Sequence, residues 1–134
     1  MFYHKFSQLR WLFICFLMSL LSCTTVTLVD INGQSKTRTT EEFKIYVEEV
    51  FRRQNNAILD VGLMLDDITD PESAHKLELA EKQLLSACEP VNEAAIRQSE
   101  QKSVSWVLQL EVKNSITECD HATHSLNEII KSLQ

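Results

Sequence analysis

The strongest pattern along the chain is a helical one. Between Phe43 and Ile68, apolar side chains recur alternately every four and every three residues, which is the spacing of one buried face of an α-helix. Thr39, followed three residues later by Glu42, forms a capping box, so we predict that this helix begins near Thr39. Gln54 is the one polar member of the face. We expect it at a partly exposed edge, the alternative being a buried polar residue that sets the helix register.

A second helix is predicted from Pro71 onward. Asp70 can cap it by accepting a hydrogen bond from a free N–H of the first turn, and proline suits the first helical position. Pro90 lacks an N–H and clashes with the carbonyl four residues earlier, so this helix should kink or restart between Cys88 and Pro90. The inward-facing residues are expected to be Leu77, Ala80, Leu84, Cys88, Val91 and Ala95.

A third helix should start between Ser103 and Trp106 and continue to the end of the chain. Three helices joined by short links predict an all-α fold, an antiparallel three-helix bundle over residues 39–134. Trp106 either is exposed as part of an interface or caps the core. The inward positions of the third helix are Leu108, Val112, Ser115 or Ile116, Cys119, Ala122 or Thr123, Leu126, Ile130 and Leu133.

The segment before the first helix has no helical pattern. Residues 25–29 are β-branched and apolar enough for a short strand, and Asn32-Gly33 is a turn signal. We expect residues 23–38 to form an extended tether that lifts the bundle off a membrane, with a short hairpin as the alternative.

The first 22 residues have the pattern of an export signal. Lys5 and Arg10 give a positive start, and an apolar run from Trp11 to Leu21 follows, broken only by Ser19. Eleven residues match a signal-peptide core but fall short of the roughly 20 needed to span a bilayer as a helix. We therefore predict a signal peptide over residues 1–22, the alternative being a buried first helix of the domain.

The sequence Leu20-Leu21-Ser22-Cys23 resembles the lipobox of bacterial lipoproteins, with Leu21 standing where Ala or Ser is more usual. The resemblance covers only the first 23 residues. It implies a cut before Cys23, which becomes a lipid-bearing N-terminus such as a palmitate-carrying one. Thr24 rather than Asp follows, which implies the outer membrane, with the domain facing the periplasm. An ordinary signal-peptidase cut after Thr24, giving a secreted protein, is the alternative.

The four cysteines can be assigned one by one. Cys15 is lost with the signal, and Cys23 carries the lipid if the lipobox interpretation holds. Cys88 and Cys119 both lie on predicted core faces, and the midpoint between them in the sequence, 103.5, falls beside the polar stretch 99–103 where the chain should reverse. Disulfides persist outside the cytoplasm, so we predict that these two residues are bonded, the alternative being two buried thiols.

Charge and composition limit the function. Of 13 basic and 19 acidic side chains, only Lys5 and Arg10 precede residue 23, so the exported part keeps 11 and 19, a formal charge of −8. Such a surface repels phosphate backbones, so we expect no nucleic-acid partner. With Gly33 and Gly62 as its only glycines, the chain cannot build a glycine-rich phosphate loop, and it has no nucleophile elbow. We therefore expect neither an enzyme nor a cofactor.

One constellation suggests metal chemistry. His121 and His124 are three residues apart, which places them on one helix face, and imidazoles can hold zinc, copper or nickel. The alternative is a solvated polar face.

We expect a lipid-anchored cell-envelope protein with a structural or protein-binding bundle, whose partner is another envelope protein. A second hypothesis is a periplasmic metal-binding or sensing module that uses His121 and His124. A third hypothesis is a secreted eukaryotic helical factor.

Overall fold

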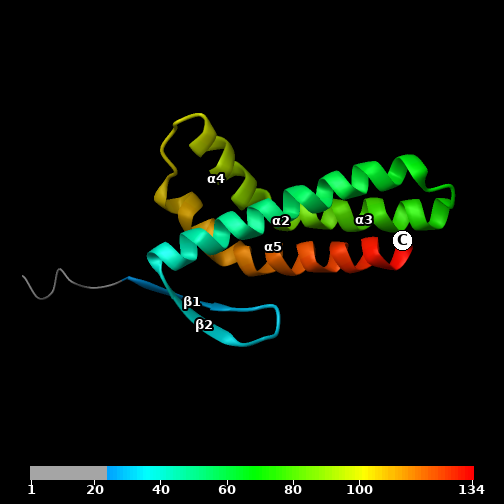
Figure 1. Cartoon of the computed structure of the whole chain (residues 1–134). Helices are drawn as coiled ribbons and strands as arrows, with labels where there is room; N and C mark the ends of the chain where they lie inside the picture. Colours follow the sequence, from blue (N-terminus) through cyan, green and yellow to red (C-terminus); the bar gives the residue numbers. More distant parts are fainter. Residues whose placement is uncertain (1–23) are drawn as a thin grey trace, which may run out of the picture.

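The computed structural model describes residues 24–134, so the predicted signal peptide and Cys23 lie outside the described residues. This part of the chain is mostly helical, with four helices and one two-stranded sheet (Figure 1). In chain order the elements are β1 (Thr25–Val29), β2 (Ser35–Thr39), α2 (Thr40–Asp67), α3 (Pro71–Ala87), α4 (Glu89–Ser99) and α5 (Trp106–Leu133).

The predicted start of the first long helix is confirmed. The Thr39 hydroxyl accepts a hydrogen bond from the Glu42 N–H at 3.3 Å, and the Glu42 carboxylate accepts one from the Thr39 N–H at 2.7 Å. These two bonds satisfy N–H groups that a helix start leaves without partners. The same bonds stabilise the charged carboxylate, which holds the pKa of Glu42 below its usual range.

The second predicted helix is in fact two helices. α3 is capped by Asp70, which accepts a bond from the Ser73 N–H at 2.8 Å, and it ends just before Cys88. α4 then begins at Glu89 with Pro90 in its first turn, and it points away from the bundle axis (Figure 1). The restart near Pro90 is therefore as predicted, but the simple three-helix bundle is wrong. The inward-facing pattern continues past Pro90 without a break and gives no sign of the change in direction.

The three long helices pack side by side. α2 and α5 run in the same direction, and α3 runs antiparallel to both (Figure 1). Each of them contributes fully buried side chains to one continuous core, and burying one such leucine or isoleucine stabilises the fold by about 1.5–3 kcal/mol. Among the described helices, none is long and apolar enough to cross a membrane. The core residues with no exposed surface are Val50, Val61, Leu77, Leu84, Cys88, Ile116, Cys119 and Leu126.

The expected tether is a hairpin. β1 and β2 pair antiparallel, with Thr25 opposite Thr39, and Gly33 adopts the positive φ of 76° that the turn requires. Leu28 is 8% exposed and packs with the core, so the hairpin is held against the bundle. The expected extended tether is therefore wrong, and the short hairpin given as its alternative is confirmed. The chain forms a hairpin because the Asp30 carboxylate stabilises the turn: it accepts hydrogen bonds from two backbone N–H groups of the turn, at 2.9 Å each.

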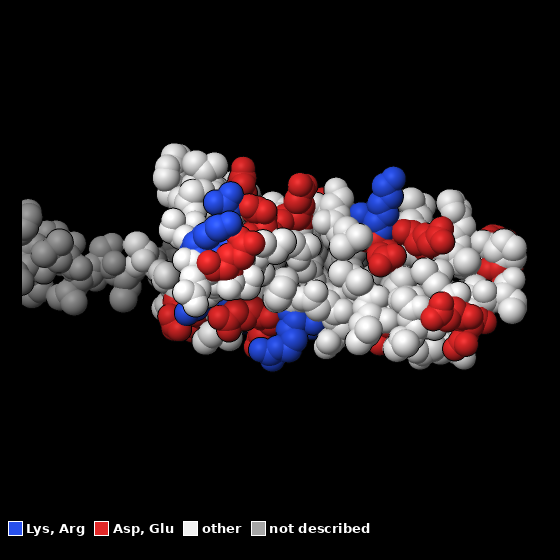
Figure 2. All heavy atoms as spheres, turned by 90° about the horizontal axis from the view of Figure 1, so that it is seen from above, with Lys and Arg blue, Asp and Glu red and all other residues white. Residues whose placement is uncertain are grey.

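Folding back of the hairpin brings Thr24 to the start of α2. The Thr40 hydroxyl donates a hydrogen bond to the Thr24 carbonyl at 2.8 Å, and the two hydroxyl oxygens are also 2.8 Å apart. The first described residue is therefore fixed at one end of the bundle. On the face of the molecule that Figure 2 shows, acidic side chains predominate over basic ones.

Candidate functional site

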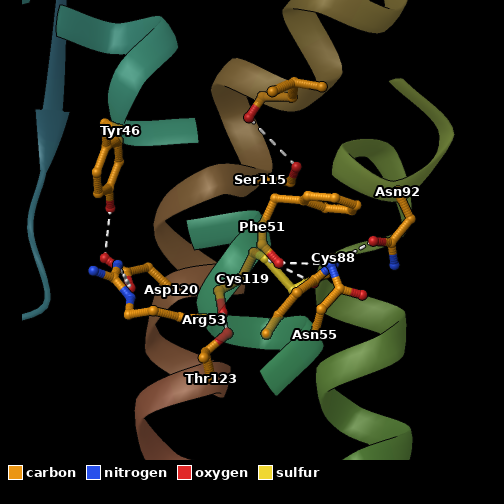
Figure 3. Close-up of a disulfide and its surroundings, with 12 residues drawn as sticks. Tyr46, Phe51, Arg53, Asn55, Cys88, Asn92, Ser115, Cys119, Asp120 and Thr123 are labelled. Atoms are coloured by element: carbon orange, nitrogen blue, oxygen red, sulfur yellow. Dashed lines mark hydrogen bonds and ion pairs between the residues drawn. A yellow bond between two sulfur atoms is a disulfide. The ribbon is translucent and has the colours of Figure 1, made fainter. Parts of the chain in front are cut away.

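A buried disulfide joins α5 to the junction between α3 and α4 (Figure 3). Cys88 stands between α3 and α4, and Cys119 lies near the middle of α5. Their sulfur atoms are bonded, their Cα atoms are 4.7 Å apart, and neither residue has exposed surface. The predicted pairing is therefore confirmed. Neither sulfur carries a thiol proton, so neither is available as a nucleophile while the bond is intact.

A polar layer surrounds this bond. Gln54 is fully buried, and its side-chain amide donates a hydrogen bond to the Asn92 side-chain oxygen on α4. Its own oxygen lies 3.5 Å from the Cys119 sulfur, which is a packing contact because a disulfide sulfur has no hydrogen to donate. The expectation of a partly exposed edge for Gln54 is wrong, because α4 supplies a partner that satisfies the buried amide. Gln54 thus connects α2, α4 and α5.

Asp120 joins the two parallel helices beside this layer. Its two carboxylate oxygens accept hydrogen bonds from the Tyr46 hydroxyl at 2.8 Å and from the Arg53 guanidinium at 2.6 Å (Figure 3). Burial, and then the bond to Asp120, raises the pKa of the Tyr46 phenol above its usual value of 10.0. The Arg38 guanidinium stacks 4.0 Å above the Tyr46 ring, a cation–π contact that connects the hairpin to α2.

One surface groove runs between α3 and α5 and has a volume of about 660 Å³. His121 and Glu118 line it, whereas His124 is exposed on the surface outside it. Within residues 24–134, no three His, Cys, Asp or Glu side chains come close enough together to hold a metal ion. The structure therefore gives the two predicted ligands no third partner.

The second groove lies between α4 and α5, beside the end of α3, with a volume of about 550 Å³. Leu85 and Ile96 are 44% and 53% exposed, so the groove offers apolar surface to a ligand. Three carboxylates, those of Glu89, Glu93 and Glu111, stand around this apolar surface. The groove thus combines an apolar interior with a charged rim, which is the general arrangement of protein-binding surfaces.

The charge at this α4–α5 groove is only partly neutralised. Arg97 binds the Glu93 carboxylate at 2.7 Å, one helical turn along α4. In the part of the chain that the structure describes, neither Glu89 nor Glu111 forms an ion pair. Two carboxylates of the described residues thus stay free to meet cationic groups of a ligand.

The predicted site residues have separate outcomes. Cys88 and Cys119 meet, His121 and His124 do not form part of a ligand cluster, and Cys23 lies outside the described residues. The α4–α5 groove is not predicted by the sequence pattern. The spacing of Glu89 and Glu93, four residues apart, was the available signal, but the partner wall on α5 is distant in sequence. The chain matches no protein-family model, no curated protein and no solved structure.

Proposed function

We propose that this protein is a lipid-anchored protein of the bacterial cell envelope, whose helical domain binds a segment of another envelope protein in the α4–α5 groove. The lipobox resemblance around Cys23 supports the anchor. The buried disulfide supports an address outside the cytoplasm, because structural disulfides persist in oxidising compartments. The absence of Asp after Cys23 favours the outer membrane.

The observation that carries the binding role is the chemistry of the α4–α5 groove. Its apolar surface, from Leu85 and Ile96, can bury apolar side chains of a ligand, and its free carboxylates can pair with lysine or arginine. We therefore infer that the ligand is an amphipathic segment that carries both basic and apolar residues. An acidic ligand, nucleic acid included, would be repelled.

The walls of the groove are held in place by bonds from other elements. The disulfide ties the start of α4 to α5, and the Gln54–Asn92 hydrogen bond ties α4 to α2. A site that is already formed loses less conformational entropy when its ligand binds. This supports a binding role for the groove over that of a loosely packed surface depression.

The anchor is tested by labelling cells with a fatty-acid analogue and measuring the mass of the mature N-terminus. The unaltered protein should incorporate label at Cys23 and partition with membranes. The Cys23→Ser variant should incorporate none, whereas Cys15→Ser should behave as the unaltered protein does. A mature protein with an unmodified N-terminus, found free of membranes, would remove the anchor from the proposal.

The groove is tested by placing a photo-reactive amino acid at Ile96 in cells. Leu79 provides a matched control, because it is 49% exposed against 53% for Ile96 but lies on α3 outside both grooves. A discrete cross-linked product should form from position 96 and not from position 79. The charge-reversed pair Glu89→Lys and Glu111→Lys should lower its yield by about tenfold, equivalent to about 1.4 kcal/mol. Equal yields at both positions, or no effect of charge reversal, would contradict the proposed site.

A further inference from the structure

The two parallel helices begin at the same end of the bundle. The Gln54 side-chain oxygen lies 3.5 Å from the Cys119 sulfur. Gln54 is 14 residues after the start of α2 at Thr40, and Cys119 is 13 residues after the start of α5 at Trp106. With a rise of 1.5 Å per residue, both starts lie roughly 20 Å from this contact, on the same side of it. Figure 1 shows this arrangement, with the start of the hairpin at the same end.

The predicted lipid attachment point also belongs to this end. Thr24 is fixed to Thr40 by two hydrogen-bonded contacts of 2.8 Å, and the preceding residue in the sequence is Cys23. If Cys23 carries lipid, then only the peptide link to Thr24 separates the anchor from the folded domain. No tether is left to hold this end of the bundle away from the membrane.

An apolar surface patch lies at the start of α5. Trp106 is 74% exposed, and Val107 and Leu110 are each 46% exposed. Leu110 lies four residues after Trp106 and three after Val107, so the three side chains share the outward side of the first turns of α5. Tryptophan combines a large apolar ring with a single N–H donor, and for that reason it is enriched at the boundary between lipid and water.

The charge distribution separates this end from the rest of the domain. The hairpin, the start of α2 and the α4–α5 connection, residues 24–44 and 97–106, carry five basic and four acidic side chains. Residues 45–96 and 107–134 carry six basic and fifteen acidic ones. An anionic lipid surface would therefore repel the body of the domain but not the end that bears Thr24 and Trp106.

We propose that Trp106, Val107 and Leu110 insert into the headgroup region of the membrane that holds the lipid anchor, so that the bundle docks on the bilayer by its hairpin end. This inference rests on the lipid anchor of the proposed function. In the docked protein the α2–α3 turn and the C-terminus point away from the bilayer. The occupant of the patch is a phospholipid surface, and the patch is distinct from the α4–α5 groove that receives the protein ligand.

Trp106 itself is the probe for the test. It is the only tryptophan after residue 22. In any preparation that keeps residues 1–22, the substitution Trp11→Phe leaves Trp106 as the only source of tryptophan fluorescence. The complete mature protein is reconstituted into phosphatidylcholine vesicles whose acyl chains carry bromine, a short-range quencher of tryptophan fluorescence. We expect Trp106 to lose most of its emission to the brominated lipid and to be protected from iodide in the buffer.

A second variant serves as the matched control. Trp106→Phe combined with Leu63→Trp moves the only tryptophan to a position that is 61% exposed near the far end of α2. Its emission should respond to iodide and not to brominated lipid. Both variants keep the core residues, so circular dichroism should show the same helical content for each.

Flotation of the vesicles separates the two proposals. If the protein floats but Trp106 remains open to iodide and unaffected by bromine, the docking is refuted and the anchor stands. Protection from iodide without bromine quenching points to a second copy of the chain on the patch, which also refutes docking. If the protein does not float and Trp106 is not quenched, both proposals fail. Bromine quenching of a Cys23→Ser variant would support the docking and show that it does not need the anchor.

Discussion

Reducing the Cys88–Cys119 bond should destabilise the folded domain by about 3–4 kcal/mol. The bond closes a segment with a sequence separation of 31 residues. In the chain-entropy description, opening a loop of this size returns about 3.7 kcal/mol of conformational freedom to the unfolded chain. Small domains have total stabilities of about 5–15 kcal/mol, so this one bond accounts for a large share of the total.

The same loss can be expressed as a shift in melting temperature. A folded part of about 110 residues has an unfolding entropy of roughly 0.23 kcal/mol/K, so a loss of 3–4 kcal/mol lowers the Tm by roughly 15 °C. The reduced protein keeps both sulfur atoms in the core, so the comparison isolates the cross-link from the packing. Reduction also lets the Cys119 thiol donate weakly to the Gln54 oxygen 3.5 Å away, which offsets a small part of the loss.

Guanidinium unfolding of the oxidised and reduced protein, followed by circular dichroism, measures this difference. The Cys88→Ala and Cys119→Ala double variant is the control, because reductant should not change its midpoint. Oxidised and reduced forms that agree within about 1 kcal/mol would refute the reasoning, since the cross-link would then constrain the unfolded chain far less than its loop length requires.

Two further changes test the packing and the buried polar contacts. Leu84→Ala should cost about 2–5 kcal/mol because Leu84 has no exposed surface, whereas Leu79→Ala, at a position 49% exposed, should cost under about 1 kcal/mol in the same guanidinium assay. Asp120→Asn removes the negative charge beside Tyr46, so the pKa of the phenol, followed by tyrosinate absorbance, should fall yet stay above 10.0 because burial remains. In the unaltered protein the pKa of Tyr46 is higher in the folded than in the unfolded state. The contribution of Tyr46 to the free energy of unfolding is therefore complete below about pH 10 and declines as the pH rises further. Unfolding experiments at a series of pH values measure this decline.

The elements that the sequence predicts well are those with local signals. The capping box at Thr39 and the proline after Cys88 act through neighbouring backbone groups, and both set a helix boundary as expected. The disulfide was predictable because both cysteines lie on inward faces, on either side of a polar reversal near their midpoint in the sequence. In each case the residues that decide the outcome are close in sequence or symmetric about one turn.

The features that the sequence leaves open depend on contacts between distant segments. β2, with the sequence Ser-Lys-Thr-Arg-Thr, has no alternation of apolar and polar residues, so only its pairing with β1 reveals it as a strand. Asp120 meets partners 74 and 67 residues earlier in the chain, and Gln54 meets Asn92 on α4, an element that the pattern did not separate from α3. No local propensity encodes such pairs.

The hairpin has a consequence for where a partner can bind. If Cys23 carries the proposed lipid, a tether would let the bundle turn freely above the membrane, whereas a bundle joined to the lipid directly before Thr24 would present its sides at defined heights. Leu108 and Glu111, which line the α4–α5 groove, lie in the first two turns of α5, within about 10 Å of Trp106 along the helix axis. If Trp106 docks on lipid, the groove opens sideways just above the headgroups. Its ligand must then be a membrane-proximal segment, and the basic residues expected in that segment would also suit the nearby anionic surface.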